Sequence, residues 1–277
     1  MDHVEGSFNG VRNTSIFHQA WLPEGETKAV VLIVHGLGEH SGRYGNVVDA
    51  LVPRGYAIYA LDHIGHGRSG GEREMVERFE DYTDTLTTYL KMVKAEQAGK
   101  RIFLLGHSMG GLIASHYLLD HQDAFAGAVI SAPAVRIGDS VSQFTILMSK
   151  VLSAIAPKMG MVALDVNALS RDPEVVQAYV DDPLVFHGKT PARLAAEMLK
   201  AMMRVTAEMG TIHLPLLVVQ GSEDKLVDPA GARMLHDAVS SQDKMLQVYE
   251  GFFHEVCNEP ECSLVLDDIA DWLDERV

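Results

Sequence analysis

Residues 101–111 read Arg-Ile-Phe-Leu-Leu-Gly-His-Ser-Met-Gly-Gly, and this stretch decides the fold. The apolar run from Ile102 to Leu105 has the character of a buried strand, and helical spacing of apolar residues begins directly after the serine. Gly106, Ser108 and Gly110 match Gly-x-Ser-x-Gly, a strained turn between a strand and a helix that exposes one serine hydroxyl. Such a string also arises by chance, but the strand before it and the helix after it favour a functional site. We therefore predict that Ser108 is a nucleophile.

Strands and helices alternate on both sides of this motif, which is typical of a mostly parallel central sheet flanked by helices. The expected strands are residues 16–21, 29–34, 57–61, 102–105, 127–131, 214–220 and 245–249, and the expected helices include 79–98, 230–239 and 263–276. The alternation breaks between residues 134 and 213, where we expect several helices and no convincing strand. We therefore predict an α/β core of residues 1–133 and 214–277, with residues 134–213 inserted as a helical cap over the strand ends.

A serine hydroxyl is a weak nucleophile and needs a general base, which a third group orients. When the serine lies on this kind of turn, the acid and then the histidine follow it along the chain. His254 follows the last expected strand and is the predicted base. Residues 221–228 offer three carboxylates, of which Asp224 is the predicted acid. Asp228 has the position of a helix cap, and Glu223 is expected to point away from its neighbour.

The oxyanion of a tetrahedral intermediate needs backbone N–H donors. One is expected from Met109, directly after the nucleophile, and the other from the loop after the expected strand 29–34. That loop reads His-Gly-Leu-Gly over residues 35–38, and the N–H of Leu37 is the predicted second donor. We interpret His35 as a structural hydrogen-bonding residue rather than as a second base.

Composition excludes several other classes of function. The formal net charge of −15 argues against nucleic-acid binding, which needs clustered Lys and Arg, and against electrostatic docking on anionic lipid. Cys257 and Cys262 are the only cysteines and have no metal-ligand spacing, so we expect neither a disulfide framework, nor a metal site, nor a cofactor. The first residues lack the features of a signal peptide, and no apolar run approaches transmembrane length. We therefore expect a cytoplasmic protein.

Six segments, spread over nearly the whole chain, carry a resemblance to known proteins. They are residues 35–44 (His-Gly-Leu-Gly-Glu-His-Ser-Gly-Arg-Tyr), 62–69, 106–111, 182–184, 221–224 and 249–255. Together they resemble the monoacylglycerol lipases of the α/β-hydrolase superfamily. The resemblance implies the α/β-hydrolase fold, a cofactor-free serine esterase that splits monoacylglycerol into glycerol and fatty acid, and the same triad and oxyanion donors as the motifs.

The resemblance also implies a binding site for the glycerol end of the substrate. It places Glu39, Arg43 and Tyr179 around that end. This chain departs from the family at one position, because animal members carry a second histidine three residues after the catalytic one, where Cys257 stands here. Head-group contacts on that side are therefore expected to differ.

Two alternatives stay open beside this interpretation. A lysophospholipase or a broad-specificity carboxylesterase would use the same triad, although a choline or phosphate head group would favour basic neighbours, and Glu39 disfavours it. A non-catalytic ligand-binding relative would need a damaged triad, whereas every candidate residue is present here. Dehalogenases and epoxide hydrolases of similar fold are disfavoured, because they carry Asp where this chain has Ser108.

The expected cap has an apolar, methionine-rich character. One helical face carries Val141, Phe144, Met148, Val151, Leu152 and Ile155. Methionine side chains adapt to flexible acyl chains, and such a face can rest on a lipid interface or pack on the core. We expect a small-molecule lipid substrate, and we keep transient contact of the cap with a membrane surface as a hypothesis.

Overall fold

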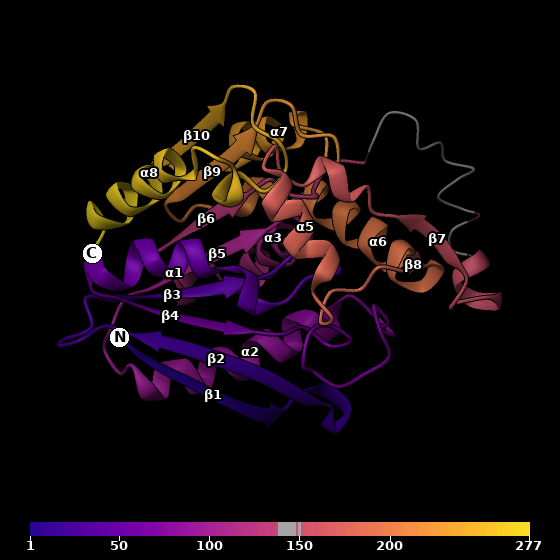
Figure 1. Cartoon of the computed structure of the whole chain (residues 1–277), viewed down its shortest axis with the longest axis horizontal. Helices are drawn as coiled ribbons and strands as arrows, with labels where there is room; N and C mark the ends of the chain where they lie inside the picture. The colour runs from indigo at the N-terminus through magenta and orange to yellow at the C-terminus, as the bar shows by residue number, and fades with distance from the viewer. Residues whose placement is uncertain (138–147, 149–150) are drawn as a thin grey trace.

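In the computed structural model, which describes residues 1–137, 148 and 151–277, the strand before Ser108 lies inside an eight-stranded sheet (Figure 1). The strand order is β1-β2-β4-β3-β5-β6-β9-β10. The strands are β1 (Asp2–Asn9), β2 (Ser15–Leu22), β3 (Ala29–Val34), β4 (Tyr56–Leu61), β5 (Ile102–His107), β6 (Gly127–Ser131), β9 (Leu216–Gly221) and β10 (Lys244–Tyr249). The last six are mutually parallel, whereas β1 and β2 join antiparallel at one edge. The predicted mostly parallel sheet is confirmed.

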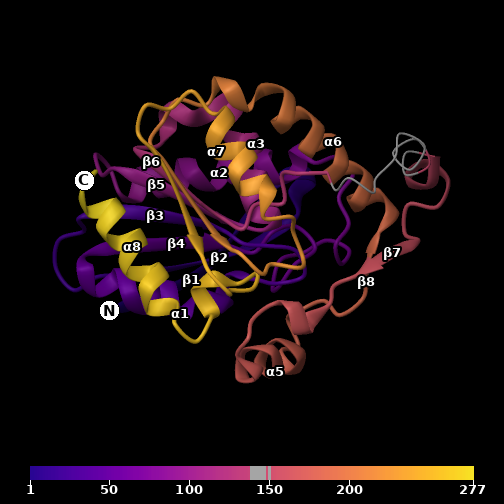
Figure 2. The ribbon, with the colours of Figure 1, turned by 90° about the horizontal axis from the view of Figure 1, so that it is seen from above.

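Helices cover both faces of the sheet, as Figure 2 shows from above. α1 (Gly45–Leu51) and α8 (Cys262–Asp274) pack on one face, and α2 (Glu80–Glu96), α3 (Met109–His121) and α7 (Ala230–Ala238) pack on the other. β3 shows why the sheet needs both layers. Val30, Leu32 and Val34 belong to the core under α2 and α3, whereas Val31 and Ile33 belong to the core under α1 and α8. Alternate residues of a strand point to opposite faces, so an uninterrupted apolar strand requires cover on both.

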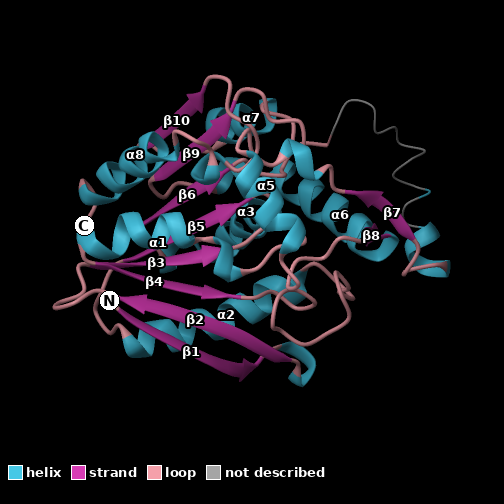
Figure 3. Cartoon of the chain, viewed as in Figure 1, coloured by secondary structure: helices cyan, strands magenta, loops and turns pink. Residues whose placement is uncertain are grey.

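The described residues of the segment 134–213 lie beyond the carboxyl ends of the parallel strands (Figure 3). They include α5 (Pro173–Asp181) and α6 (Ala192–Glu208), together with two short antiparallel strands, β7 (Gly160–Ala163) and β8 (Lys189–Pro191). The expectation of an insertion without strands is therefore wrong. Both strands have at most four residues and β7 is exposed throughout, so neither shows the apolar alternation that marks a strand in sequence. Val141 and Phe144 lie outside the described residues.

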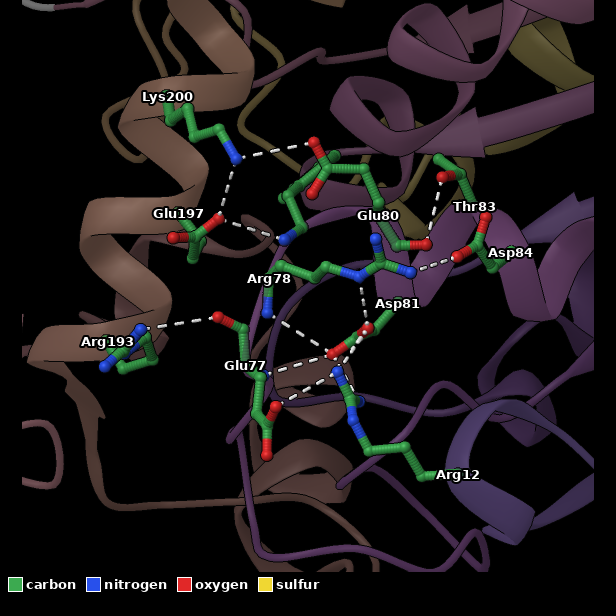
Figure 4. A network of polar contacts seen from close by, with 11 residues as sticks. Arg12, Glu77, Arg78, Glu80, Asp81, Thr83, Asp84, Arg193, Glu197 and Lys200 are labelled. Atoms are coloured by element: carbon green, nitrogen blue, oxygen red, sulfur yellow. Dashed lines mark hydrogen bonds and ion pairs between the residues drawn. The ribbon is translucent and has the colours of Figure 1, made fainter.

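A polar network attaches α6 to the start of α2 (Figure 4). The Asp81 carboxylate accepts hydrogen bonds from both terminal nitrogens of Arg12, at 2.7 and 2.9 Å, and from Nε of Arg78 at 3.2 Å. On the other side of the same turn, the Glu197 carboxylate of α6 accepts from the Phe79 N–H at 3.1 Å. The amino-terminal hairpin, α2 and α6 therefore meet at one joint.

Among the described residues, no helix combines the length and the apolar character needed to cross a membrane.

Candidate active site

The turn after β5 places Ser108 at the carboxyl edge of the sheet. Ser108 has φ 56° and ψ −119°, and its N–H donates to the Ser131 carbonyl oxygen at 2.9 Å. A positive φ is strained for a residue with a side chain and persists only where the surroundings enforce it. The flanking glycines allow this turn. A β-carbon at Gly106 would lie 2.6 Å from the Gly110 carbonyl oxygen, and one at Gly110 would lie 2.0 Å from the Val34 carbonyl oxygen.

His254 and Asp224 form a buried pair beside this turn. His254 Nδ1 lies 2.7 Å from Asp224 Oδ2, and the two side chains are 3% and 0% exposed. The other oxygen, Oδ1, accepts from the N–H groups of Leu226 and Val227 at 2.8 and 3.1 Å. Burial alone would raise the pKa of the Asp224 carboxyl, but the hydrogen bond to His254 and these N–H groups outweigh burial and lower it. The carboxylate is thus held ionised and oriented toward the histidine.

The two other carboxylates of this loop are directed elsewhere. Asp228 accepts from the Ala230 N–H at 2.9 Å at the start of α7 and forms an ion pair with Arg136. Glu223 is exposed. Of the three acids considered from sequence, only Asp224 contacts His254.

The loop after β3 packs directly on the serine. A β-carbon on Gly36 would lie 3.2 Å from Ser108 Cβ, so the N–H of Leu37 is close to the nucleophile. The Met109 N–H is the first of α3, where N–H groups lack partners within the helix. The His35 ring stabilises this loop. Its Nδ1 forms a hydrogen bond with the Gly36 carbonyl oxygen at 2.8 Å, and its Nε2 accepts from the His63 N–H at 2.8 Å.

Glu39 lies under the same loop and is nearly saturated with hydrogen bonds. Its Oε1 accepts from the Gly36 N–H at 2.6 Å and the Tyr44 hydroxyl at 2.9 Å, and its Oε2 accepts from Arg43 at 3.1 Å. Arg43 also donates two hydrogen bonds to Glu255, at 2.6 and 2.9 Å. Burial would raise the pKa of the Glu39 carboxyl, but nearby groups, chiefly the Arg43 guanidinium, outweigh burial and lower that pKa.

A cavity of about 290 Å³ opens over Ser108. Six of the predicted site residues and Glu255 line it, and its remaining wall is mostly apolar. The predicted residues on the wall are Leu37, Glu39, Ser108, Met109, Tyr179 and His254, and the apolar side chains are Leu164, Leu169, Met198, Met202, Leu226 and Val227. Asp224 lies behind His254, and Arg43 lies behind the wall with its guanidinium 4.6 Å from the Tyr179 ring. In the described chain, no three His, Cys, Asp or Glu side chains are placed to share a metal ion.

Sequence reasoning missed His107, which lies between this cavity and a smaller one. Its ring packs on His254 with centroids 4.8 Å apart, and its Nδ1 lies 3.2 Å from Ser131 Oγ. Burial, with help from His254, lowers the pKa of His107 to about 4, so the ring is neutral near pH 7. Its position directly before the nucleophile in the sequence could have identified it as a residue of the site.

Cys257 lines the smaller cavity, of about 20 Å³, together with Arg43 and His107. Burial raises the pKa of this thiol to about 12. A neutral thiol is a weak hydrogen-bonding group, so this wall offers less to a polar head group than a histidine would.

Comparisons with known proteins agree with this geometry. The profile of a family described as "Serine aminopeptidase, S33" matches residues 25–261. The chain is 40% identical to a monoacylglycerol lipase of Mycolicibacterium smegmatis over 97% of this chain and 96% of that protein, and 35% identical to the Homo sapiens monoglyceride lipase over 94% and 87%. The crystal structure of the Paleococcus ferrophilus monoacylglycerol lipase matches with a TM-score of 0.83 at 30% identity, covering 100% of both chains. The chain therefore belongs to the monoacylglycerol lipase family of the α/β-hydrolases.

Proposed function

We propose that the protein hydrolyses monoacylglycerol to glycerol and a free fatty acid through an acyl-enzyme on Ser108. The observation that carries this proposal is the buried Asp224–His254 pair on the cavity that also exposes Ser108. The similarity to monoacylglycerol lipases along almost the whole chain supports the same substrate class.

The reaction uses His254 twice. The Asp224 carboxylate accepts a hydrogen bond from the Nδ1–H of His254, so Nε2 is free to take the proton of Ser108 as the serine oxygen attacks the ester carbonyl. His254 then gives this proton to the departing glycerol oxygen, and a water molecule repeats the sequence to release the fatty acid. The N–H groups of Leu37 and Met109 stabilise the oxyanion in both halves, and one such donor is typically worth about 3–4 kcal/mol.

Glu39 and Tyr179 serve the glycerol end in this proposal. An ionised carboxylate offers about four acceptor positions, and three hydrogen bonds to Glu39 are already made inside the protein. The remaining position and the Tyr179 hydroxyl are available to glycerol hydroxyls. Arg43 acts indirectly, by keeping Glu39 ionised and packing on the Tyr179 ring.

The apolar wall serves the acyl end, and we propose that residues 134–213 act as a cap over it. Leu164 and Leu169 come from the segment before α5, and Met198 and Met202 lie one helical turn apart on α6. A cavity of about 290 Å³ suits one acyl chain better than two. The cap thereby favours monoacylglycerol over diacylglycerol and triacylglycerol.

The rim of the proposed cap supports contact with a lipid surface. Its exposed apolar side chains include Ile155, Met159, Met161 and Val162, with 74%, 42%, 38% and 67% exposure. Apolar side chains of this kind insert at a lipid interface without requiring basic residues. We propose a cytoplasmic enzyme, consistent with two free thiols, that meets its substrate at such an interface.

A substrate panel tests the activity. Wild-type protein should hydrolyse monoacylglycerol and react covalently with an organofluorophosphonate, and Ser108→Ala should lose both while keeping its thermal unfolding midpoint. Rates should fall steeply from monoacylglycerol to triacylglycerol. A higher kcat/KM for a lysophospholipid than for monoacylglycerol would instead assign the protein to the lysophospholipases, and turnover by Ser108→Ala would overturn the mechanism.

A further inference from the structure

The loop that carries His254 is connected to the segment 169–171 on both sides of the histidine, directly on one side and through Glu259 on the other. The Glu255 N–H, directly after His254, donates to the Leu169 carbonyl oxygen at 2.8 Å. The Phe253 N–H, directly before it, donates to Glu259 Oε1 at 3.2 Å. The backbone N–H of each residue that flanks His254 therefore has a fixed partner.

Glu259 joins the two segments through one buried carboxylate. Its side chain is 0% exposed. The oxygen that accepts from Phe253 also accepts from the Arg171 N–H at 3.0 Å, and the second oxygen forms a charge-assisted hydrogen bond with Nε of Arg171. The Arg171 guanidinium in turn lies 4.8 Å from the Phe252 ring. Each oxygen of the Glu259 carboxylate thus has a partner in the segment 169–171.

We propose that Glu259 is a positioning residue that holds His254 in register with the wall of the acyl cavity. Leu169 lines that cavity, and its carbonyl oxygen accepts from the N–H directly after His254. The wall that contacts the acyl chain is therefore connected rigidly to the base. The inference rests on the proposed function, in which His254 takes the proton of Ser108.

The chain offers a matched control for this proposal. Glu261 also forms a salt bridge with Arg171, but its side chain is 51% exposed and it makes no hydrogen bond to the peptides beside His254. If the effect came only from a weaker contact to Arg171, Glu261→Gln would lose activity as well. If it came from the lost hydrogen bond to the Phe253 N–H, only the Glu259 variants would lose activity.

The test compares Glu259→Ala, Glu259→Gln and Glu261→Gln in the full chain, with active sites titrated and unfolding midpoints measured. A misplacement of about 1 Å can lower a rate by about 10²-fold. We therefore expect Glu259→Ala to lower kcat by about 30-fold to 100-fold on monoacylglycerol and on p-nitrophenyl butyrate, with KM changed less than threefold, and to slow fluorophosphonate labelling of Ser108 equally. Gln keeps an oxygen that accepts from both N–H groups, so Glu259→Gln should recover part of the loss.

Two results would overturn the inference. One is a Glu259→Ala or Glu259→Gln protein that is folded and labels Ser108 at the rate of Glu261→Gln. The other is a loss in KM alone. If Glu259→Ala does not fold, the comparison of Glu259→Gln with Glu261→Gln decides. His254→Ala is included because its full activity would refute the proposed function itself, whereas an inactive His254→Ala beside an active Glu259→Ala refutes only the positioning role.

Discussion

Glu74 is a buried carboxyl whose ionisation should make the protein less stable above neutral pH. It is 3% exposed and has φ 51°, and within the described residues its Oε2 has no hydrogen-bond partner. It lies beside the site, because a β-carbon on Gly38 would lie 3.4 Å from Glu74 Oε1 and 3.0 Å from the Tyr179 hydroxyl oxygen. Burial raises the pKa of this carboxyl from 4.5 to about 7, against the opposing effect of the Thr190 side chain.

The sign of the effect follows from proton binding. Below pH 4.5 the carboxyl is protonated in both the folded and the unfolded chain. Between pH 4.5 and about 7 the unfolded chain releases this proton and the folded protein keeps it, so the free energy of unfolding falls as the pH rises. Above pH 7 both forms are ionised and the loss is complete. The interval corresponds to at most about 3.5 kcal/mol, at about 1.4 kcal/mol for each pKa unit.

Glu74→Gln removes the ionisation and keeps the shape. We expect its free energy of unfolding to exceed that of the wild type by about 2–3 kcal/mol at pH 8 and by less than about 1 kcal/mol at pH 5. Urea unfolding at both pH values measures the difference. Glu72→Gln is the control, because that side chain is 53% exposed in a surface ion pair with Lys158 and should change stability by less than about 0.5 kcal/mol. An equal gain at both pH values, or none at pH 8, would refute the reasoning.

Three further predictions concern the site and the cap. Asp224→Asn should lower kcat about 10⁴-fold, whereas Asp228→Asn should stay near wild type, because the Asp228 carboxylate binds the start of α7 and Arg136. Steady-state kinetics measures both, and a larger loss in Asp228→Asn would show that Asp224 is not the catalytic acid. Glu39→Gln should lower kcat/KM for monoacylglycerol about tenfold or more while p-nitrophenyl butyrate, which has no glycerol, is hydrolysed nearly as before, and equal losses would assign Glu39 to its own loop. Val162→Asp should weaken flotation with phosphatidylcholine vesicles, unlike Met245→Asp on the exposed edge of β10, and equal flotation of both variants would remove the lipid-contact proposal.

Local patterns made the core of the fold and the nucleophile turn predictable. β3, β5, β6 and β9 are short apolar runs bounded by turn residues, and the turn around Ser108 is specified by residues that adjoin it in sequence. β1 was not predicted, because six of its eight positions are exposed and the other two are only partly buried, so its sequence shows no apolar alternation. β7 and β8 were not predicted either, because both are short and β7 is exposed throughout.

Contacts between distant segments could not be predicted in this way. Glu259 contacts Arg171, and Asp81 contacts Arg12, and in both cases the partners come together only in the complete fold. The sequence shows two ordinary charged residues in each case. Glu39 is intermediate: the family resemblance placed it near glycerol, but its hydrogen bonds to Gly36 and Tyr44 depend on how the loop after β3 folds.

The joint around Asp81 connects the amino terminus with the acyl wall. Arg12 lies in the turn between β1 and β2, and two of the hydrogen bonds to the Asp81 carboxylate come from it. A protein shortened to begin at β2 would keep this carboxylate enclosed, at 1% exposure in the full chain, while losing that cation. A shift of this turn would displace the Phe79 N–H that donates to Glu197, and with it α6, which carries Met202. We therefore expect an amino-terminal truncation that removes Arg12 to alter acyl-chain preference, although it changes no residue near Ser108.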